Sequence, residues 1–197
     1  MSFDCLNIPT VPNPQGIDVI INNIQTQLGL ISWMDYSFGK AYLKKEDRSG
    51  TTYNIPKAWG GHNEFITLIP TDEVRAFSFV ESFETETFND YENRKFDYSS
   101  TTDISLVVFA NLDMIDNSKN YIFTEELKKD VLNALTSVPS IAVTSIEKGL
   151  DSSYSNWSYE SIEPSFYSEK YAAFKVNINA VISSSCYQEN TYNLTNC

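Results

Sequence analysis

The stretch from Tyr171 to Ile182, "YAAFKVNINAVI", alternates between apolar and polar side chains. Its even-numbered residues are all apolar, and Lys175, Asn177 and Asn179 lie between them. Because successive side chains of a strand point to opposite faces, this pattern predicts a strand with one buried and one solvated face. A solvated face is typical of an antiparallel sheet, so we expect this strand to belong to one.

A second stretch, from Asp103 to Leu112, is apolar on both of its faces. Alternate residues from Ile104 to Leu112 form one apolar face, and Val107 and Phe109 lie on the other. This pattern predicts a central strand that is covered on both sides. Further strands are predicted at residues 33–47, 51–55, 65–69, 74–88 and 141–147.

The first two of these further strands are expected to pair as a long hairpin. Arg48-Ser49-Gly50 supplies the turn between them, because Ser and Gly favour tight turns. The tip of the hairpin is charged and consists of Lys44, Lys45, Glu46, Asp47 and Arg48.

Two amphipathic helices are predicted, one before the first strand and one after the central strand. Asn13 and Pro14 form a typical helix opening, and apolar residues then recur at three- and four-residue steps as far as Ile31. Thr124 caps the second helix and Pro139 ends it. The expected fold is therefore α+β: a mostly antiparallel sheet with two helices packed on one face.

We expect residues 1–197 to form a single domain, because a chain of this length supplies one substantial core. The core is expected at residues 14–183, with an N-terminal arm at 1–13 and a C-terminal tail at 184–197. A long loop insertion rich in Ser and Tyr falls at residues 149–170. Because the chain has neither a long apolar run nor a secretory signal, we expect no membrane contact and synthesis in the cytoplasm.

The formal net charge of the chain is −12. Phosphate backbones repel such a chain, which argues against binding nucleic acid in a basic groove or in a sequence-specific way. Acidic residues are concentrated between Glu81 and Glu92 and again between residues 150 and 169. These segments are interpreted either as solvated surfaces or as a face that something negatively charged must pass without adhering.

The stretch from Trp59 to Phe65, "WGGHNEF", contains the only histidine of the chain. His62 and Glu64 could both bind a metal from one side of a strand, but no third ligand lies at a recognisable spacing. We interpret Gly60 and Gly61 as a bend that leads into the next strand, since glycine adopts backbone angles closed to other residues. The sequence predicts no catalytic residue, no cofactor and no metal site.

Four aromatic residues of the insertion have two possible roles. They could be core residues of a loop folded back on the sheet, or anchors for a partner. They are Trp157, Tyr159, Phe166 and Tyr167.

Four further stretches point to a family through their order along the chain. They are "YSFGKAYLKKEDRSGTTYNIPKAWGG", "EFITLIPTDEVRAFSFV", "TEELKKDVLNAL" and "YSEKYAAFKVNINAVI". In their order along the chain and in their residue composition, these stretches resemble the tail-terminator and head–tail joining ring proteins of tailed bacteriophages. The resemblance covers residues 14–183. In general character the sequence is similar to proteins of phages that infect Bacteroidetes hosts. These phages include the crAss-like group, whose virions contain stacked rings. The insertion and the tail after Ser183 are longer than in compact members.

This resemblance implies a structural, non-enzymatic subunit that closes into a homo-oligomeric ring of six or twelve copies. Such a ring lies in the neck or tail of the virion, contacts neighbouring portal, neck, ring or tail proteins, and lets the DNA pass through. A long hairpin in this family reaches a neighbouring copy, so Lys44, Lys45 and Arg48 are candidate contacts, as are the four insertion aromatics. Glu84 and Glu86 are candidate acids facing the channel.

Two other classes of function remain open from the sequence. Trp59, Trp157 and the many tyrosines could form a platform for carbohydrate, which predicts a β-rich sugar- or receptor-binding module of a phage particle. An enzyme is disfavoured, because no nucleophile lies in a recognisable catalytic setting.

Overall fold

In the computed structural model, the described residues are 10–48, 50–61, 64–82, 85–89, 99–158, 162 and 164–183. They form a mixed α+β structure with a sheet of eight strands, which confirms the α+β class. In chain order the elements are α1 (Ile17–Leu28), β1 (Tyr36–Arg48), β2 (Thr51–Gly61), β3 (Glu64–Thr67), β4 (Ala76–Glu81), β5 (Thr87–Asn89), β6 (Ser99–Asn111), α2 (Leu112–Ile115), α3 (Thr124–Leu135), β7 (Ile141–Lys148), α4 (Leu150–Ser153), a 3₁₀ helix (Pro164–Tyr167) and β8 (Tyr171–Ser183).

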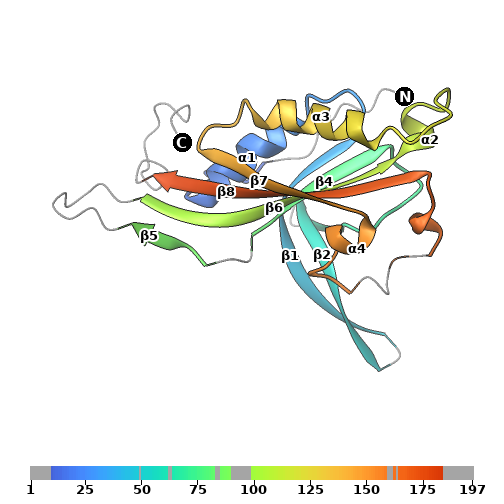
Figure 1. Ribbon diagram of the computed structural model, residues 1–197. Helices are drawn as coiled ribbons and strands as arrows, with labels where there is room; N and C mark the ends of the chain where they lie inside the picture. Colours follow the sequence, from blue (N-terminus) through green and yellow to red (C-terminus); the bar gives the residue numbers. More distant parts are fainter. Residues whose placement is uncertain are drawn as a thin grey trace.

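The strands follow the order β3-β2-β1-β4-β6-β8-β7 across the sheet, and β5 pairs with β6 off this path (Figure 1). All neighbours are antiparallel except β1 and β4, which run parallel. The longest pairing joins the whole of β6 to the whole of β8, from Ser99 opposite Ser183 to Asn111 opposite Tyr171. The two stretches with the clearest alternation thus lie side by side at the centre of the molecule.

Helices α1 and α3 cover one face of the sheet (Figure 1). Ile20 and Ile24 of α1 and Val131 of α3 are buried in one cluster with the apolar residues of β6 and β8. On β8 these residues are the alternating set from Ala172 to Ile182, as its pattern predicts. Burying a side chain of this size contributes about 1.5–3 kcal/mol, so this cluster is a main source of stability.

The helix boundaries differ from those predicted. Helix α1 begins at Ile17 rather than Pro14, because Gly16 precedes it with φ 56° and ψ −128°, angles that only glycine adopts readily. Thr124 lies inside α3 and Phe123 precedes the helix, without a side-chain cap hydrogen bond. The helix also ends at Leu135, before Pro139. Glu125 and Glu126 do occupy its first turn, where acidic side chains favour the helix dipole.

The insertion covers the opposite face of the sheet. Tyr154, Trp157 and Phe166 are buried there against Phe79 of β4 and Phe109 of β6. Phe79 meets Tyr154 and Trp157 edge to face, with ring centroids 5.8 and 6.4 Å apart. The insertion is therefore a second packed layer, and β6 is buried from both sides.

Several predicted strands have other limits: the one expected from Trp33 begins at Tyr36 as β1, and the one expected at 51–55 continues to Gly61 as β2. The stretch expected as one strand at 74–88 contains β4 and the first two residues of the separate short strand β5. Lys175 of β8, expected on a solvated face, is only 4% exposed because the insertion covers it. Asn177 and Asn179 on the same face are half-buried. The polar face of β8 is thus accessible to solvent only where the insertion does not cover it, as at Asn177 and Asn179.

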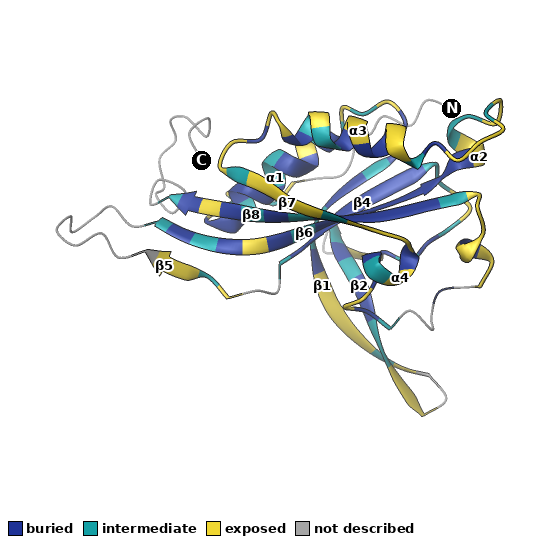
Figure 2. Ribbon diagram, in the orientation of Figure 1, coloured by how far each residue is buried: buried dark blue, intermediate teal, exposed yellow. Residues whose placement is uncertain are grey.

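The hairpin of β1 and β2 extends from the body as an arm (Figure 1). Its strands pair from Ala41 opposite Ala58 to Arg48 opposite Thr51, and Gly50 in the turn has φ 84°. Figure 2 shows the outer half of β1 exposed, whereas β4 and β8 are buried over most of their length. The outer part of the arm therefore presents its side chains to solvent, whereas Ala41 and Ile55 nearer the body are buried.

Candidate functional site

A buried ion pair lies between the sheet and the insertion. Lys175 comes from β8 and Glu81 from the end of β4, on either side of β6. The Lys175 Nζ lies 2.9 Å from the Glu81 Oε2, and the two side chains are 5% and 2% exposed. Removing both charges from water costs several kcal/mol, which further hydrogen bonds must offset.

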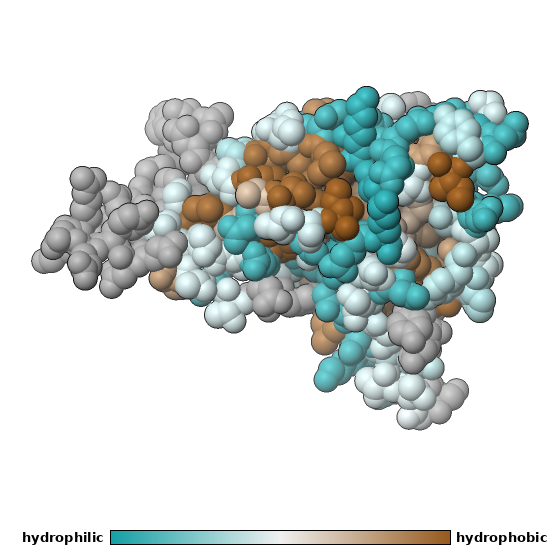
Figure 3. All heavy atoms as spheres, viewed as in Figure 1, coloured by the Kyte–Doolittle hydropathy of each residue, from teal (hydrophilic) through white to brown (hydrophobic). Residues whose placement is uncertain are grey.

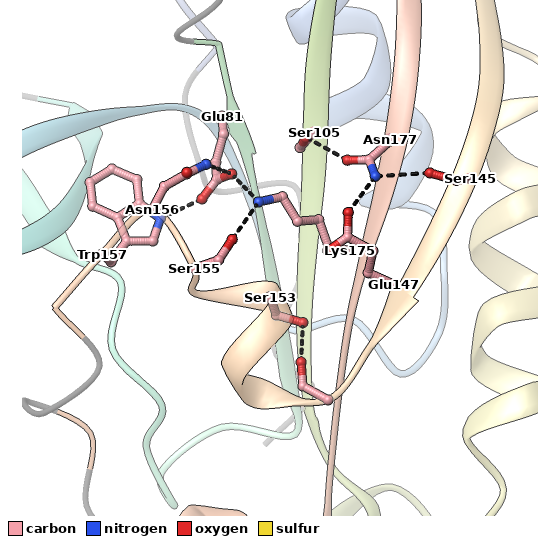
Figure 4. Close-up of polar contacts among 11 residues, drawn as sticks. Glu81, Ser105, Ser145, Glu147, Ser153, Ser155, Asn156, Trp157, Lys175 and Asn177 are labelled. Atoms are coloured by element: carbon pink, nitrogen blue, oxygen red, sulfur yellow. Dashed lines mark hydrogen bonds and ion pairs between the residues drawn. The ribbon is translucent and has the colours of Figure 1, made fainter.

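The insertion supplies those further hydrogen bonds (Figure 4). Trp157 donates its Nε1–H to the Glu81 Oε1. The Asn156 Nδ2 donates to the Glu81 Oε2 at 3.0 Å, and the Lys175 Nζ donates to the Ser155 Oγ at 3.3 Å. The pair and these three residues, here called the buried cluster, therefore fasten the insertion to β4 and β8.

Tyr154 fastens the same insertion to the end of the β2–β3 region. Its hydroxyl donates to the backbone carbonyl of Leu68 at 3.2 Å, in a fully buried position. Burial, and secondarily the negative charge of Glu81, raises the pKa of Tyr154 well above its ordinary value. The hydroxyl therefore stays protonated and remains a donor across the physiological range.

The insertion also contacts the arm directly. The Ser158 N–H donates to the Asn54 carbonyl at 3.0 Å, and the Asn54 N–H donates to the Ser158 Oγ at 2.8 Å. Asn54 lies on β2, opposite Lys45 of β1. Through these two bonds the insertion braces the arm against the body, which fixes the direction in which the arm points.

A polar groove of about 440 Å³ lies beside the buried cluster. The Asn177 side chain is its centre: it accepts from the Ser105 Oγ at 2.8 Å and donates to Ser145 Oγ at 2.9 Å and Glu147 Oε1 at 2.7 Å (Figure 4). Asn179 donates to Asp103 at 2.9 Å next to it. Chemically, the groove offers hydrogen-bonding groups and negative charge to a ligand. The polar groups of the buried cluster, by contrast, bond to one another and hold the insertion on β4 and β8.

The indole hydrogen bond to Glu81 gives a testable result. We expect Trp157→Phe to lower the free energy of unfolding by about 1.5–3 kcal/mol, because a hydrogen bond to a buried charge is lost while most ring packing remains. Urea unfolding followed by circular dichroism measures the loss. Trp59→Phe, at a half-buried tryptophan of β2, is the control and should cost less than about 1 kcal/mol. Equal losses in both variants would contradict a special role for the bond.

The predicted basic contacts lie on the arm. Lys44 and Lys45 are exposed, and the Lys44 Nζ forms an ion pair of 2.7 Å with Glu46. Arg48 ends β1, but its side chain lies outside the described residues. The two lysines are thus both exposed on the projecting arm, on opposite faces of β1.

The four insertion aromatics divide between the two roles left open. Trp157 and Phe166 are buried in the core of the chain itself, so they do not form an exposed contact surface. Tyr167 is exposed and donates its hydroxyl to Asp151 Oδ1 at 2.9 Å. Tyr159 lies outside the described residues. A carbohydrate platform of Trp59 and Trp157 is not formed, because Trp157 is covered.

The acidic segment is only partly described. Glu81, counted with the solvated acids from the sequence, is buried in the ion pair with Lys175. Glu86 is half-buried and accepts from the Ser100 Oγ at 3.4 Å. Glu84 lies outside the described residues. Of the acids of this segment that the structure describes, Glu81 therefore faces the insertion and Glu86 contacts β6.

The chain reverses direction at the "WGGHNEF" stretch. Gly61 has φ 91° and pairs with Glu64, and β2 and β3 run antiparallel on either side. This agrees with the predicted bend. His62 itself lies outside the described residues.

Sequence patterns did not reveal the buried cluster. Lys175 fits the polar side of an alternating strand, and Glu81 fits an acidic surface segment, so each has an ordinary interpretation alone. A signal was present in the position of the insertion, which directly precedes β8 and carries Trp157 and Tyr154. An aromatic segment of this kind has to cover apolar surface, and the nearest surface includes the polar side of β8.

The sequence matches no protein-family model, and a search of the curated proteins finds no match. Within the described ranges, no group of three or more His, Cys, Asp or Glu side chains is placed to hold a metal ion. No helix in this part of the chain is long and apolar enough to cross a membrane.

Proposed function

We propose that this chain is a structural virion protein that assembles into a ring in the neck or tail of a phage, as a head–tail joining or tail-terminator subunit. The single observation that supports this best is the arm, a braced hairpin that projects from the body with an exposed surface. Copies of the chain and neighbouring portal, ring or tail proteins are its expected partners.

The chemistry of the arm favours a protein contact. Tyr42 and Leu43 of β1 are exposed on it, and Tyr42 packs edge to face on exposed Phe65 of β3 at 5.7 Å. Between Tyr36 and Gly61 five basic residues stand against two acidic ones, a net charge of +3 in a chain of −12. A basic, partly apolar arm on an acidic molecule complements the remaining surface of another copy.

The acidic character of the rest of the chain supports the passage of DNA. A channel wall that carries negative charge makes few phosphate contacts, so the DNA releases few counterions and does not adhere. Glu84 and Glu86 stay the candidate acids for this wall under the proposal.

The polar groove favours a second candidate, a module that binds carbohydrate or a receptor on the host surface. Amide, hydroxyl and carboxylate groups of Asn177, Ser105 and Asp103 are suited to hydrogen bonding with sugar hydroxyls. A monomer that binds glycans would support this candidate, whereas rings without glycan affinity would support the first.

Assembly in solution tests the proposed function directly. Native mass spectrometry and negative-stain imaging of the purified full chain should show closed rings. We expect Leu43→Asp with Lys45→Glu to lower ring formation at least about tenfold, because these changes place negative charge on the arm where it meets an acidic neighbour.

The matched control is Leu30→Asp with Lys129→Glu, which makes the same changes at exposed positions outside the arm. Both double variants should unfold at similar urea concentrations, since exposed substitutions cost little stability. A wild-type chain that stays monomeric at all concentrations would overturn the proposal, as would equal assembly of both variants.

A further inference from the structure

The described sheet has two outermost strands, β3 at one end and β7 at the other. Outermost strands expose backbone groups that can pair with another chain, so proteins usually protect them with charged residues or proline. Neither kind of residue occurs between Ile141 and Ile146 of β7, "IAVTSI". This edge is therefore uncharged over six residues, and one irregularity interrupts its pairing with β8, between Val143 and Ser145.

The side chains of β7 add an exposed apolar patch to this edge. Val143 is 41% exposed, and Ile141, Ile146 and Leu132 are only partly buried beside it. Figure 3 shows the hydrophobic patch over β7 and the adjoining part of α3, with hydrophilic surface around it. An apolar patch rimmed by polar residues is typical of a surface that binds another protein.

The β3 edge also exposes apolar side chains, and its first residue, Glu64, is charged. All four residues of β3 are exposed, including Phe65 at 52% and Ile66 at 43%. Ile66 lies against Gly60 of β2, where an added Cβ would approach the Ile66 side chain to 2.6 Å. The apolar surface of β3 is thus held in place and faces outward.

Charge distinguishes which edges can meet. Residues 36–67, which contain β1 to β3, hold five basic and three acidic residues, a net charge of +2. Residues 103–183, which contain most of β6 and all of α3, β7 and β8, hold eleven acidic and six basic residues, a net charge of −5. The part of the chain that contains β7 is therefore acidic and the part that contains β3 is basic, which favours contacts between unlike parts of neighbouring copies.

We propose that β7 of one copy pairs with β3 of the next, so that the sheets of neighbouring copies join into one. Following the pairings across the sheet, β3 and β7 point in opposite directions. Two copies related by rotation about an axis along the strands therefore bring these edges together antiparallel. This head-to-tail contact uses two different edges, which is the type of contact that closes a ring.

The proposal rests on the proposed ring and names its interface, so the experiment separates the two. Val143→Lys blocks the β7 edge and Ile66→Lys blocks the β3 edge, each by placing a charge in an apolar contact. Val181→Lys is the matched control, because Val181 is also 41% exposed but lies on β8, one strand in from the edge. Each edge variant alone should need at least about tenfold more protein to assemble, and the control should assemble normally.

Mixing the two edge variants in equal amounts gives the decisive result. The Val143→Lys chain keeps an intact β3 edge and the Ile66→Lys chain an intact β7 edge, so one contact can form. We expect a heterodimer and nothing larger by native mass spectrometry. Thr144→Pro is the second β7 variant: Thr144 falls in the irregularity between Val143 and Ser145, and its hydroxyl donates to the Asn177 carbonyl of β8 at 3.1 Å, a hydrogen bond that proline removes together with a backbone N–H.

The other outcomes contradict the pairing. Rings formed equally well by all variants would leave the ring proposal intact and overturn this interface. Normal assembly of Ile66→Lys with loss of assembly in Val143→Lys would indicate that β7 pairs with β7. A wild-type monomer would overturn the ring proposal itself. Circular dichroism and urea unfolding of each variant confirm that the loss is one of assembly rather than folding.

Discussion

Lys175→Met should lower the free energy of unfolding by about 3–5 kcal/mol, one of the largest effects expected of any single change in this chain. The substitution keeps the length of the side chain but removes the ammonium group 2.9 Å from Glu81. The Glu81 carboxylate then stays buried with only Trp157 and Asn156 as donors. Urea unfolding of the purified protein gives the change directly, and domain stabilities of about 5–15 kcal/mol make such a loss conspicuous.

A second substitution should restore most of this stability. Glu81→Gln in the Lys175→Met background leaves no buried charge, and the amide oxygen of the glutamine still accepts from Trp157. The control is Lys170→Met, because Lys170 is exposed and pairs with Asp113 at 3.5 Å on the surface. That change should cost less than about 1 kcal/mol. If Lys170→Met lowers the free energy of unfolding as much as Lys175→Met does, the buried ion pair contributes no more to stability than an exposed one.

The central part of the fold follows from the sequence because its pattern is local. The apolar residues of β6 and β8 repeat every second position, and this repeat fixes which side chains share a face whatever the rest of the chain does. Helices α1 and α3 have an equally local repeat. Their starts differ from the predicted ones because Asn13 and Thr124 fit a helix start by residue type, whereas Gly16 and Phe123 take that position by backbone conformation.

The second layer could not be predicted in the same way. The insertion has no period, so its sequence leaves both roles open, and the burial of Trp157 and Phe166 in the core assigns these two residues to the first. The buried cluster depends on contacts between β4, β8 and the insertion, which lie far apart in the sequence. Two oppositely charged residues about ninety positions apart have no sequence signal that they will meet.

The candidate interaction surfaces were predicted in part. The charged hairpin was expected, and its exposed lysines lie where the sequence places them. The two edges of the sheet were not foreseen, because the order of the strands is a property of the whole fold. Only the strand order shows that β7, which is uncharged from Ile141 to Ile146, has no described strand on its outer side.

The second large effect is expected at Ile178. This residue is 1% exposed and lies in the helix-side cluster, opposite Ile104 of β6 and Val143 of β7. Ile178→Asp removes the apolar packing, worth about 2–5 kcal/mol, and also buries a carboxylate without a partner. The sum approaches or exceeds the whole stability of a typical domain, so the variant should show no cooperative unfolding transition.

Two further variants make the Ile178 result specific to the face of the strand. Ile178→Ala should keep a cooperative transition and lower the free energy of unfolding by about 2–5 kcal/mol, since it leaves a cavity but no charge. Val181→Asp places the same charge on the opposite face of β8, where the side chain is 41% exposed, and should cost less than about 1 kcal/mol. Circular dichroism and urea unfolding of the three variants compare these outcomes. A folded Ile178→Asp protein beside an unfolded Val181→Asp protein would mean that the two faces of β8 are reversed, because each charge would then act on the side opposite to that expected.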